Sequence, residues 1–262
     1  MATAWRILRK RLKWYPYKPH KVVDLTDEHR AGRKEFCEWM ASQPEGFATN
    51  VIWSDEKWFQ LQAPPNVQNE RYWYPHDPEV EAECRVQGGH KVMAWAGLFR
   101  GKVIIHWFEN GKSVNGETYL QMLQQDIWPR VSRTVSQHQT WFQQDGATVH
   151  TTISAREWLH EKFGQRVISR FTDRPWPAKS PDLSPLDYWF WSVAMQELSR
   201  NPPSSIEELK SIVEGFAASL DPTEVNKAVR SITKRAQACA AKNGGHFQHL
   251  LKHTNIMNNG DF

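Results

Sequence analysis

The sequence predicts an α/β protein in which helices cover a mixed β-sheet. Three observations lead to this fold class: short β-branched and aromatic runs bounded by turn residues, segments with apolar residues at helical spacing, and their order, β-β-β-α-β-α-β-α. Such an order is typical of a mixed sheet with helices packed on its faces. With 262 residues and 40% hydrophobic content, the chain can bury one substantial core, so we expect one main domain with a small addition.

The N-terminal segment combines helical spacing with concentrated positive charge. Ala4, Leu8 and Leu12 fall on one side of a helix predicted over 4–15, and the prolines of WYPYKPH end it. Seven basic residues and no acidic residue lie within 1–21, which leaves 26 of the 33 basic residues against 29 acidic residues elsewhere. This distribution favours a polyanionic partner such as nucleic acid. A solvated helix face is the alternative.

The next segments alternate between helix and strand signals. Thr26 is the predicted N-cap of a helix that ends near Met40. Helices are also predicted over 116–131 and 151–163. The dipeptide Arg100-Gly101 indicates a hairpin between the second and third strands. Strands are predicted at 48–61, 91–99, 102–109, 140–145 and 166–171.

The segment 62–90 is too long for a simple connection between paired strands. It is rich in Pro, Asn, Glu and aromatic residues, and includes Arg71, Trp73 and Tyr74. We interpret it as a functional insertion, the alternative being a surface loop with its own aromatic cluster.

Helices are predicted to close the chain and to cover the sheet. Ser205 and Glu208 have the spacing of a capping box, which opens one helix. The dipeptide Asp221-Pro222 opens another, which runs toward the stop signal at Gly244. The charged residues of these helices are interpreted as a solvated outer face; they include Lys227, Arg230, Lys234 and Arg235.

Hydropathy and cysteine usage argue against several classes of protein. No apolar run reaches the roughly 18 residues of a membrane span. The N-terminus MATAWRILRK places basic residues where a signal peptide needs apolar ones, so we expect an intracellular protein without a membrane partner. Cys37, Cys84 and Cys239 are widely spaced and lack CxxC pairing, which indicates neither a disulfide framework nor a zinc site.

Three aspartates stand at positions that suit a metal site. Asp55 lies in the middle of the first predicted strand, where an ionised group is costly unless it is exposed or binds something positive. Asp145 ends the fourth, and ligands bind at strand ends in open α/β folds. Asp187 begins the aromatic-rich helix. If the first and fourth strands are neighbours, the three carboxylates can converge on Mg²⁺ or Mn²⁺.

Structural roles are open alternatives for the same residues. Asp187 follows Ser184 and Pro185 at the third position of a helix start, where a carboxylate is favourable anyway. Asp182, which lies among prolines, suits an ordinary turn. The residues alone leave the catalytic and the structural interpretations open.

Two further residues near these aspartates are expected to have ordinary roles. His150 follows Asp145 by five residues and is interpreted as a packed or surface histidine, with a contact to phosphate or metal as the alternative. Glu56 follows Asp55, so strand alternation turns its side chain away from the metal site.

Three acidic blocks carry a family resemblance. VIWSDEKWF, WFQQDGATVH and SPDLSPLDYWFW, in this order, resemble those of the mariner superfamily of cut-and-paste DNA transposases. The resemblance covers essentially all of 48–250, including VMAWAGLF and AAKNGGHF. It implies an RNase H-like domain with a mixed five-stranded sheet and helices on both faces. It also implies metal-dependent phosphodiester hydrolysis at transposon ends and transfer of the 3′-hydroxyl into target DNA, by a dimer acting in the nucleus.

The resemblance assigns the three metal-binding acids to Asp55, Asp145 and Asp187, which would hold two Mg²⁺ or Mn²⁺ ions. Asp182 is then expected to shape the turn that delivers Asp187. Between Asp145 and Asp187 lie 41 residues, more than in the best-known mariner branch, so the loop around FTDRPWPAKS departs from the family pattern.

The resemblance also divides the chain. We expect a basic helical remnant of a DNA-binding domain with its linker (1–47), a catalytic domain (48–250) whose insertion 62–90 resembles the family's clamp, and a C-terminal tail (251–262). Family members usually carry two helix-turn-helix units first, so a truncated chain is expected. The predicted phosphate contacts are Arg6, Arg9, Lys10, Arg11 and Lys13. The alternatives are an inactive or domesticated DNA-binding remnant and a stand-alone nuclease.

Overall fold

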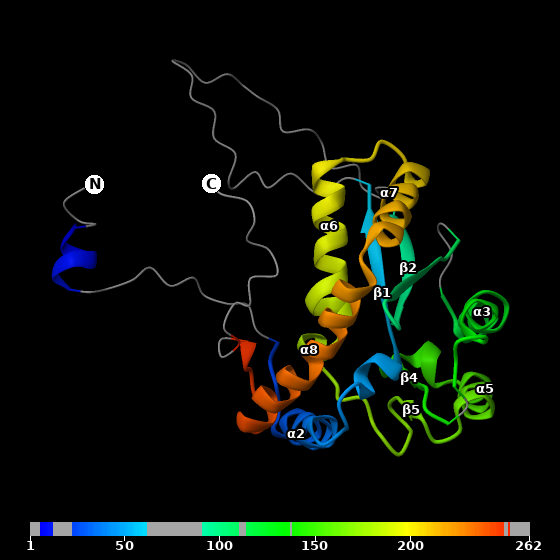
Figure 1. The fold of residues 1–262 in the computed structure, drawn as a ribbon, viewed down its shortest axis with the longest axis horizontal. Helices are drawn as coiled ribbons and strands as arrows, with labels where there is room; N and C mark the ends of the chain where they lie inside the picture. The colour runs from blue at the N-terminus through cyan, green and yellow to red at the C-terminus, as the bar shows by residue number, and fades with distance from the viewer. Residues whose placement is uncertain are drawn as a thin grey trace.

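The computed structural model of the chain describes residues 6–12, 23–61, 91–109, 114–136, 138–248 and 251 (Figure 1). The described residues contain a five-stranded sheet in the order β3-β2-β1-β4-β5. Its strands are β1 (Val51–Gln60), β2 (Lys91–Phe99), β3 (Lys102–Trp107), β4 (Trp141–Gln143) and β5 (Val167–Ile168). The predicted mixed sheet is thereby confirmed. The insertion 62–90 lies outside the described residues.

Strand pairing brings the two acid-bearing strands side by side. β1 pairs antiparallel with β2 and parallel with β4, and the parallel register joins Trp53 to Gln143. The β2–β3 hairpin turns at Arg100 and Gly101, whose φ angles of 48° and 76° lie in the left-handed region that such a two-residue turn requires. The hairpin agrees with the prediction from sequence, and the β1–β4 neighbourhood meets the condition on which convergence of the three carboxylates depends.

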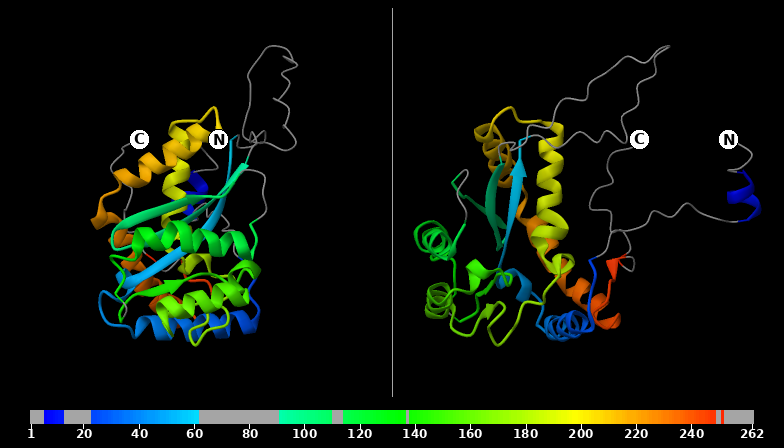
Figure 2. Two further views of the ribbon diagram at one scale, coloured as in Figure 1. Left: turned by 90° about the vertical axis from the view of Figure 1, so that its right-hand side faces the viewer. Right: turned by 180° about the vertical axis from the view of Figure 1, so that it is seen from behind.

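Helices cover both faces of the sheet. α3 and α5 lie on one face, and α2, α6, α7 and α8 gather on the other (Figures 1 and 2). The α-helices are α2 (Asp27–Ala41), α3 (Gly116–Met122), α4 (Trp128–Val131), α5 (Ile153–Phe163), α6 (Trp191–Arg200), α7 (Ile206–Ser219) and α8 (Pro222–Ala241). None of the described helices combines the length and apolar character needed to cross a membrane.

Short helical turns connect or extend these elements. The π-helical turns are η1 (Ile7–Arg11), η3 (Leu123–Ile127) and η6 (Leu186–Phe190). The 3₁₀ turns are η2 (Phe47–Asn50), η4 (Thr148–Thr151) and η5 (Pro181–Leu183). The helix predicted over 116–131 is therefore continuous but contains a π-helical turn. Of the helix predicted over 4–15, residues 6–11 are helical in the part that the structure describes.

Strand alternation separates two hydrophobic clusters. Trp53 packs with the cluster beneath α2, α6 and α8, whereas its neighbour Ile52 packs with Trp95 beneath α3 and α5. Because side chains two residues apart share a face of a strand, Asp55 projects on the α6 side and Glu56 on the α3 side. This alternation places the two acids in different surroundings, as expected for Glu56.

The predicted caps of α2 and α8 are confirmed, and the cap of α7 differs from its prediction in one detail. Thr26 accepts a hydrogen bond from the His29 N–H at the start of α2, and Asp221 accepts one from Thr223 at the start of α8. Ser205 accepts from the Glu208 N–H, but the Glu208 carboxylate accepts from the N–H and hydroxyl of Ser204 rather than from Ser205. The reciprocal half of the predicted capping box is thus shifted by one residue.

Candidate active site

Asp55, Asp145 and Asp187 line one cavity of about 720 Å³. β4 ends at Gln143 while its parallel neighbour β1 continues, so Asp55 and Asp145 both lie just beyond the last paired residues. Asp187 belongs to η6, the π-helical turn that continues directly into α6. The cavity is also lined by backbone or side chains of Glu28, His29, Ser54, Gly146, Arg170, Trp176 and Lys179.

Asp55 is half-buried and held by one hydrogen bond. Its Oδ2 accepts from the indole Nε1–H of Trp191 at 2.7 Å. Burial raises the pKa of Asp55 to about 8, and the charges of Asp187, Glu56 and Asp145 add to this, although the Trp191 hydrogen bond acts in the opposite direction. Without a cation nearby, Asp55 is therefore largely protonated at neutral pH.

Asp145 is held by two donors on one oxygen. Its Oδ1 accepts from the Ala147 N–H at 2.9 Å and from His150 Nδ1 at 2.7 Å. Burial acts to raise the pKa of Asp145, but the hydrogen bonds from His150 and Ala147 and the histidine charge lower it overall. Asp145 thus stays ionised where Asp55 does not.

His150 is a buried cation between two carboxylates. Its Nε2 lies 3.1 Å from Glu56 Oε1, and its ring packs 4.4 Å from the ring of Tyr119. Burial acts to lower the pKa of His150, yet the contacts with Asp145 and Glu56 outweigh it and raise the pKa to about 10. The expected packed histidine is confirmed, and its ion pairs with both acids are an addition that the sequence did not reveal.

Asp187 lies at the open side of the cavity. Its backbone N–H donates to Ser184 Oγ at 3.4 Å, as the predicted helix start requires. The residue is exposed, but protein surrounds the carboxylate closely enough that burial raises the pKa of Asp187 to about 6. The Ser184 hydroxyl and Lys57 lower this pKa, whereas Asp145 and Asp182 raise it.

The donor set fits a hard divalent cation in its chemistry. All three groups are carboxylates, and no described residue donates a hydrogen bond to Asp55 Oδ1 or Asp145 Oδ2. Burial, with the neighbouring acids, raises the pKa values of Asp55 and Asp187, and a bound cation would favour their ionised forms. As the side chains stand, however, no three Asp, Glu, His or Cys residues of the described segments form a group that could hold an ion.

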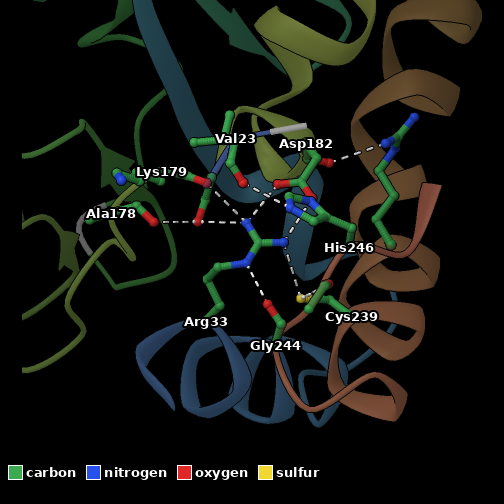
Figure 3. A network of polar contacts seen from close by, with 11 residues as sticks. Val23, Arg33, Ala178, Lys179, Asp182, Cys239, Gly244 and His246 are labelled. Carbon is green, nitrogen blue, oxygen red and sulfur yellow. Dashed lines mark hydrogen bonds and ion pairs between the residues drawn. The ribbon is translucent and has the colours of Figure 1, made fainter. Parts of the chain in front are cut away.

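Asp182 is separate from this set and belongs to a buried network (Figure 3). Its two carboxylate oxygens each accept a hydrogen bond at 2.7 Å from Arg33 of α2. Arg33 also donates to Ser180 Oγ at 2.9 Å and to the carbonyl of Gly244 at 2.8 Å. Asp182 therefore anchors the turn that leads to Asp187, the structural role expected for it.

The predicted phosphate contacts are only partly within the described residues. Arg6, Lys10 and Arg11 are exposed at η1. The side chain of Arg9 and all of Lys13 lie outside the described residues. Contact of these residues with DNA stays a prediction.

Sequence reasoning missed two residues that support the site. Arg33 occupies the buried face of α2 with Phe36, Cys37 and Met40, and this i, i+3, i+4, i+7 spacing could have identified it as a buried arginine. Trp191 follows Asp187 by one helical turn in the aromatic-rich helix. No local signal shows that its indole nitrogen reaches Asp55.

Comparisons with known proteins identify two curated relatives, although no family model matches the chain. The transposable element Tc3 transposase of Caenorhabditis elegans is 27% identical over 216 residues, which cover 80% of this chain and 60% of the relative. The mariner Mos1 transposase of Drosophila mauritiana is 24% identical over 245 residues, which cover 90% of this chain and 66% of the relative. The chain thus spans less than two thirds of the length of either relative.

Solved structures of Mos1 share the fold. The Mos1 paired-end complex with the left transposon end matches with a TM-score of 0.77 and 23% identity, over 94% of this chain and 71% of that chain. The Mos1 catalytic domain alone matches with a TM-score of 0.63 and 21% identity, over 88% of this chain and 100% of that chain. The fold is thus RNase H-like, and the chain is homologous to the Tc3 and mariner Mos1 transposases.

Proposed function

We propose that the chain carries the catalytic core of a DNA transposase. It hydrolyses a phosphodiester bond at a transposon end and transfers the freed 3′-hydroxyl into target DNA. The single observation that carries the proposal is the meeting of Asp55 of β1, Asp145 just beyond β4 and Asp187 of η6 at one cavity. These are the three acidic blocks in the order of the mariner superfamily, and homology to Tc3 and Mos1 supports the same activity.

The three aspartates would hold two divalent cations, Mg²⁺ or Mn²⁺. When bound, such a pair stabilises the attacking and the leaving oxygen of a phosphoryl displacement. Trp191 fixes Asp55 through Oδ2 and leaves Oδ1 for a ligand, and His150 with Ala147 does the same for Asp145. Mos1 complexes have been solved with Mg and with Mn, in support of this choice of ion.

Asp187 is the acid that completes the ligand set. Asp55 and Asp145 are each fixed by hydrogen bonds from side chains, whereas Asp187 is exposed at the open side of the cavity. A rotation of its side chain toward the other two acids would close the set, whereas the anchored turn at Asp182 keeps its backbone in place.

The proposed partner is DNA, as transposon end and as target. Arg6, Arg9, Lys10, Arg11 and Lys13 would bind phosphates without reading sequence. Mos1 was solved in a paired-end complex with a transposon end, which supports a DNA partner for its homologue. Action as a homodimer and in the nucleus follows from the family resemblance and belongs to the same proposal.

Strand cleavage tests the proposal directly. Wild-type chain is incubated with Mn²⁺ and a labelled duplex that carries the terminal inverted repeat flanking its own gene. We expect labelled strand products with the wild type, none with Asp187→Asn, and wild-type amounts with Glu207→Gln, an exposed acid of α7 outside the acidic cavity. Cleavage by Asp187→Asn would contradict the assignment. Salt-sensitive DNA binding by a wild type that yields no product would identify an inactive remnant instead.

A further inference from the structure

An exposed phenylalanine with two arginines over its ring lies between the acidic cavity and a second hollow. Phe171 is 52% exposed, and the guanidinium carbons of Arg170 and Arg156 lie 5.0 and 5.5 Å from the centre of its ring. Arg170 lines the acidic cavity, whereas Phe171 and Arg156 line the second hollow, of about 380 Å³. We call Arg156, Arg170 and Phe171 the arginine platform.

The two guanidinium groups of the platform lack a counter-charge. Neither guanidinium group forms an ion pair or a hydrogen bond with any residue of the described segments, and both arginines are exposed. Contact with an aromatic ring orients a guanidinium and leaves its N–H donors free. The platform therefore presents two oriented, unneutralised charges to an anionic partner.

The position of Arg170 connects the platform to the acidic cavity. A Cβ placed on Gly146 would lie 3.2 Å from Arg170 Cδ, so the arginine stem packs on the backbone beside Asp145. A DNA strand that passes Asp145 and leaves the cavity on this side must cross Arg170. Beyond it, Phe171 and the 72% exposed Ile153 offer apolar surface at the edge of the second hollow.

We propose that the arginine platform binds the phosphodiester backbone of the DNA strand that occupies the acidic cavity. Arginines bind phosphates, and exposed aromatic rings beside them are typical of nucleic-acid grooves. Glu157 and Asp173 line the second hollow, and their carboxylates would repel phosphates there. The phosphates therefore lie over the arginine platform and not inside the second hollow. The inference rests on the proposed function, because only a DNA substrate brings a strand to this place.

The salt dependence of DNA binding tests the platform without requiring catalysis. The full 262-residue chain is titrated onto a fluorescein-labelled DNA duplex in EDTA, and affinity is measured by anisotropy at several salt concentrations. For the double variant Arg156→Gln/Arg170→Gln, we expect weaker binding and a slope of log K against log salt that is shallower by about 1.8, or about 0.9 for each lost phosphate contact. Arg230→Gln, an exposed arginine of α8, is the matched control and should keep the wild-type slope.

Phe171→Leu separates the ring from the charges. We expect about two- to fivefold weaker binding with a nearly unchanged slope, since both arginines remain but lose the ring that orients them. A double variant with the affinity and slope of Arg230→Gln would overturn the platform. If the double variant behaves like Arg230→Gln but the wild type still cleaves its transposon end, the platform is wrong and the proposed function stands. If the double variant loses DNA affinity as expected but the wild type never cleaves DNA, the proposed function is wrong and the platform stands.

Discussion

Arg33 and Asp182 form a buried ion pair in which two nitrogens of the guanidinium each lie 2.7 Å from a carboxylate oxygen (Figure 3). The side chains are only 1% and 5% exposed. The pair joins α2 to the turn that precedes η6, and Arg33 continues the connection to the Gly244 carbonyl after α8. α2, the turn at Asp182 and the segment after α8 thus meet at Asp182, which precedes Asp187 by five residues.

Removal of one partner of this pair is expected to destabilise the fold strongly. Arg33→Met leaves Asp182 as an unpaired buried charge, and we expect the free energy of unfolding to fall by about 3–5 kcal/mol, measured by urea denaturation. The double variant Arg33→Met/Asp182→Leu should recover part of the loss because no buried charge remains.

Lys34→Met is the matched control for the buried pair. The Lys34 side chain is 43% exposed, and its Nζ lies 3.9 Å from Glu38 Oε1, a surface contact that contributes less than about 1 kcal/mol. An Arg33→Met variant as stable as Lys34→Met would show that the buried pair does not hold the turn.

Asp55→Asn is expected to stabilise the metal-free protein. The raised pKa of Asp55, about 8, means that the folded state binds a proton that the unfolded state releases near pH 4. Stability contributed by this group therefore falls as pH rises from about 4 to about 8. Asparagine keeps an oxygen for the Trp191 hydrogen bond without the charge, so we expect a gain of about 1 kcal/mol or more at pH 8.

Thermal or urea unfolding in EDTA at pH 5 and pH 8 measures this difference. The stabilisation by Asp55→Asn should be larger at pH 8 than at pH 5. At pH 8 the unfolded wild type has its Asp55 ionised and solvated, so the unfavourable surroundings of Asp55 in the folded state lower the stability of the wild type more than at pH 5. An equal or opposite effect at the two pH values would contradict the raised pKa.

Cation binding is expected to compete with protons. An ion requires ionised ligands, whereas Asp55 and Asp187 have pKa values of about 8 and about 6 in its absence. The apparent affinity for Mn²⁺ should therefore rise between pH 6 and pH 8. Calorimetry at pH 7 in two buffers of different ionisation enthalpy should show proton release by the wild type. The Asp55→Asn variant should release fewer protons than the wild type when Mn²⁺ binds, which would identify Asp55 as a source of the released protons. Mn²⁺ binding without pH dependence would exclude these ligands.

The sequence predicted the elements whose signals are local. The capping residue Thr26, the Arg100-Gly101 turn and the β-branched runs each act through near neighbours, so each fixed its own helix, turn or strand. The order of elements alone leaves open whether β1 lies beside β4, a condition for the metal site that the structure meets.

Strand lengths and supporting contacts depend on partners distant in sequence. β5 ends at Ile168 because the Ser169 N–H donates to the Arg174 carbonyl at 3.2 Å, inside a loop that departs from the family pattern. β4 ends at Gln143, and the carboxylate of Asp145 turns back to Ala147. Spacing and periodicity carry no information about such contacts, and the ion pair of Arg33 belongs to the same class.

His150 is expected to give the site a distinct pH dependence. The pKa of His150 is raised to about 10 from an ordinary value near 6.5, because Asp145 and Glu56 hold its charged form. Its contribution to stability is fully present below about pH 6.5 and is lost as pH rises toward 10. His150→Gln removes the cation, so we expect a loss of about 1.5–3 kcal/mol at pH 6, as for hydrogen bonds to charged groups.

Urea denaturation at pH 6, pH 8 and pH 9.5 checks this expectation. The difference between the wild type and His150→Gln should shrink as pH rises, whereas His160→Gln, an exposed histidine of α5, should stay close to the wild type throughout. Because loss of His150 also leaves Asp145 facing Glu56 without a cation between them, the variant should bind Mn²⁺ with a changed affinity at pH 6. A constant difference in stability across this range would mean that His150 is neutral in the folded protein and only fills space.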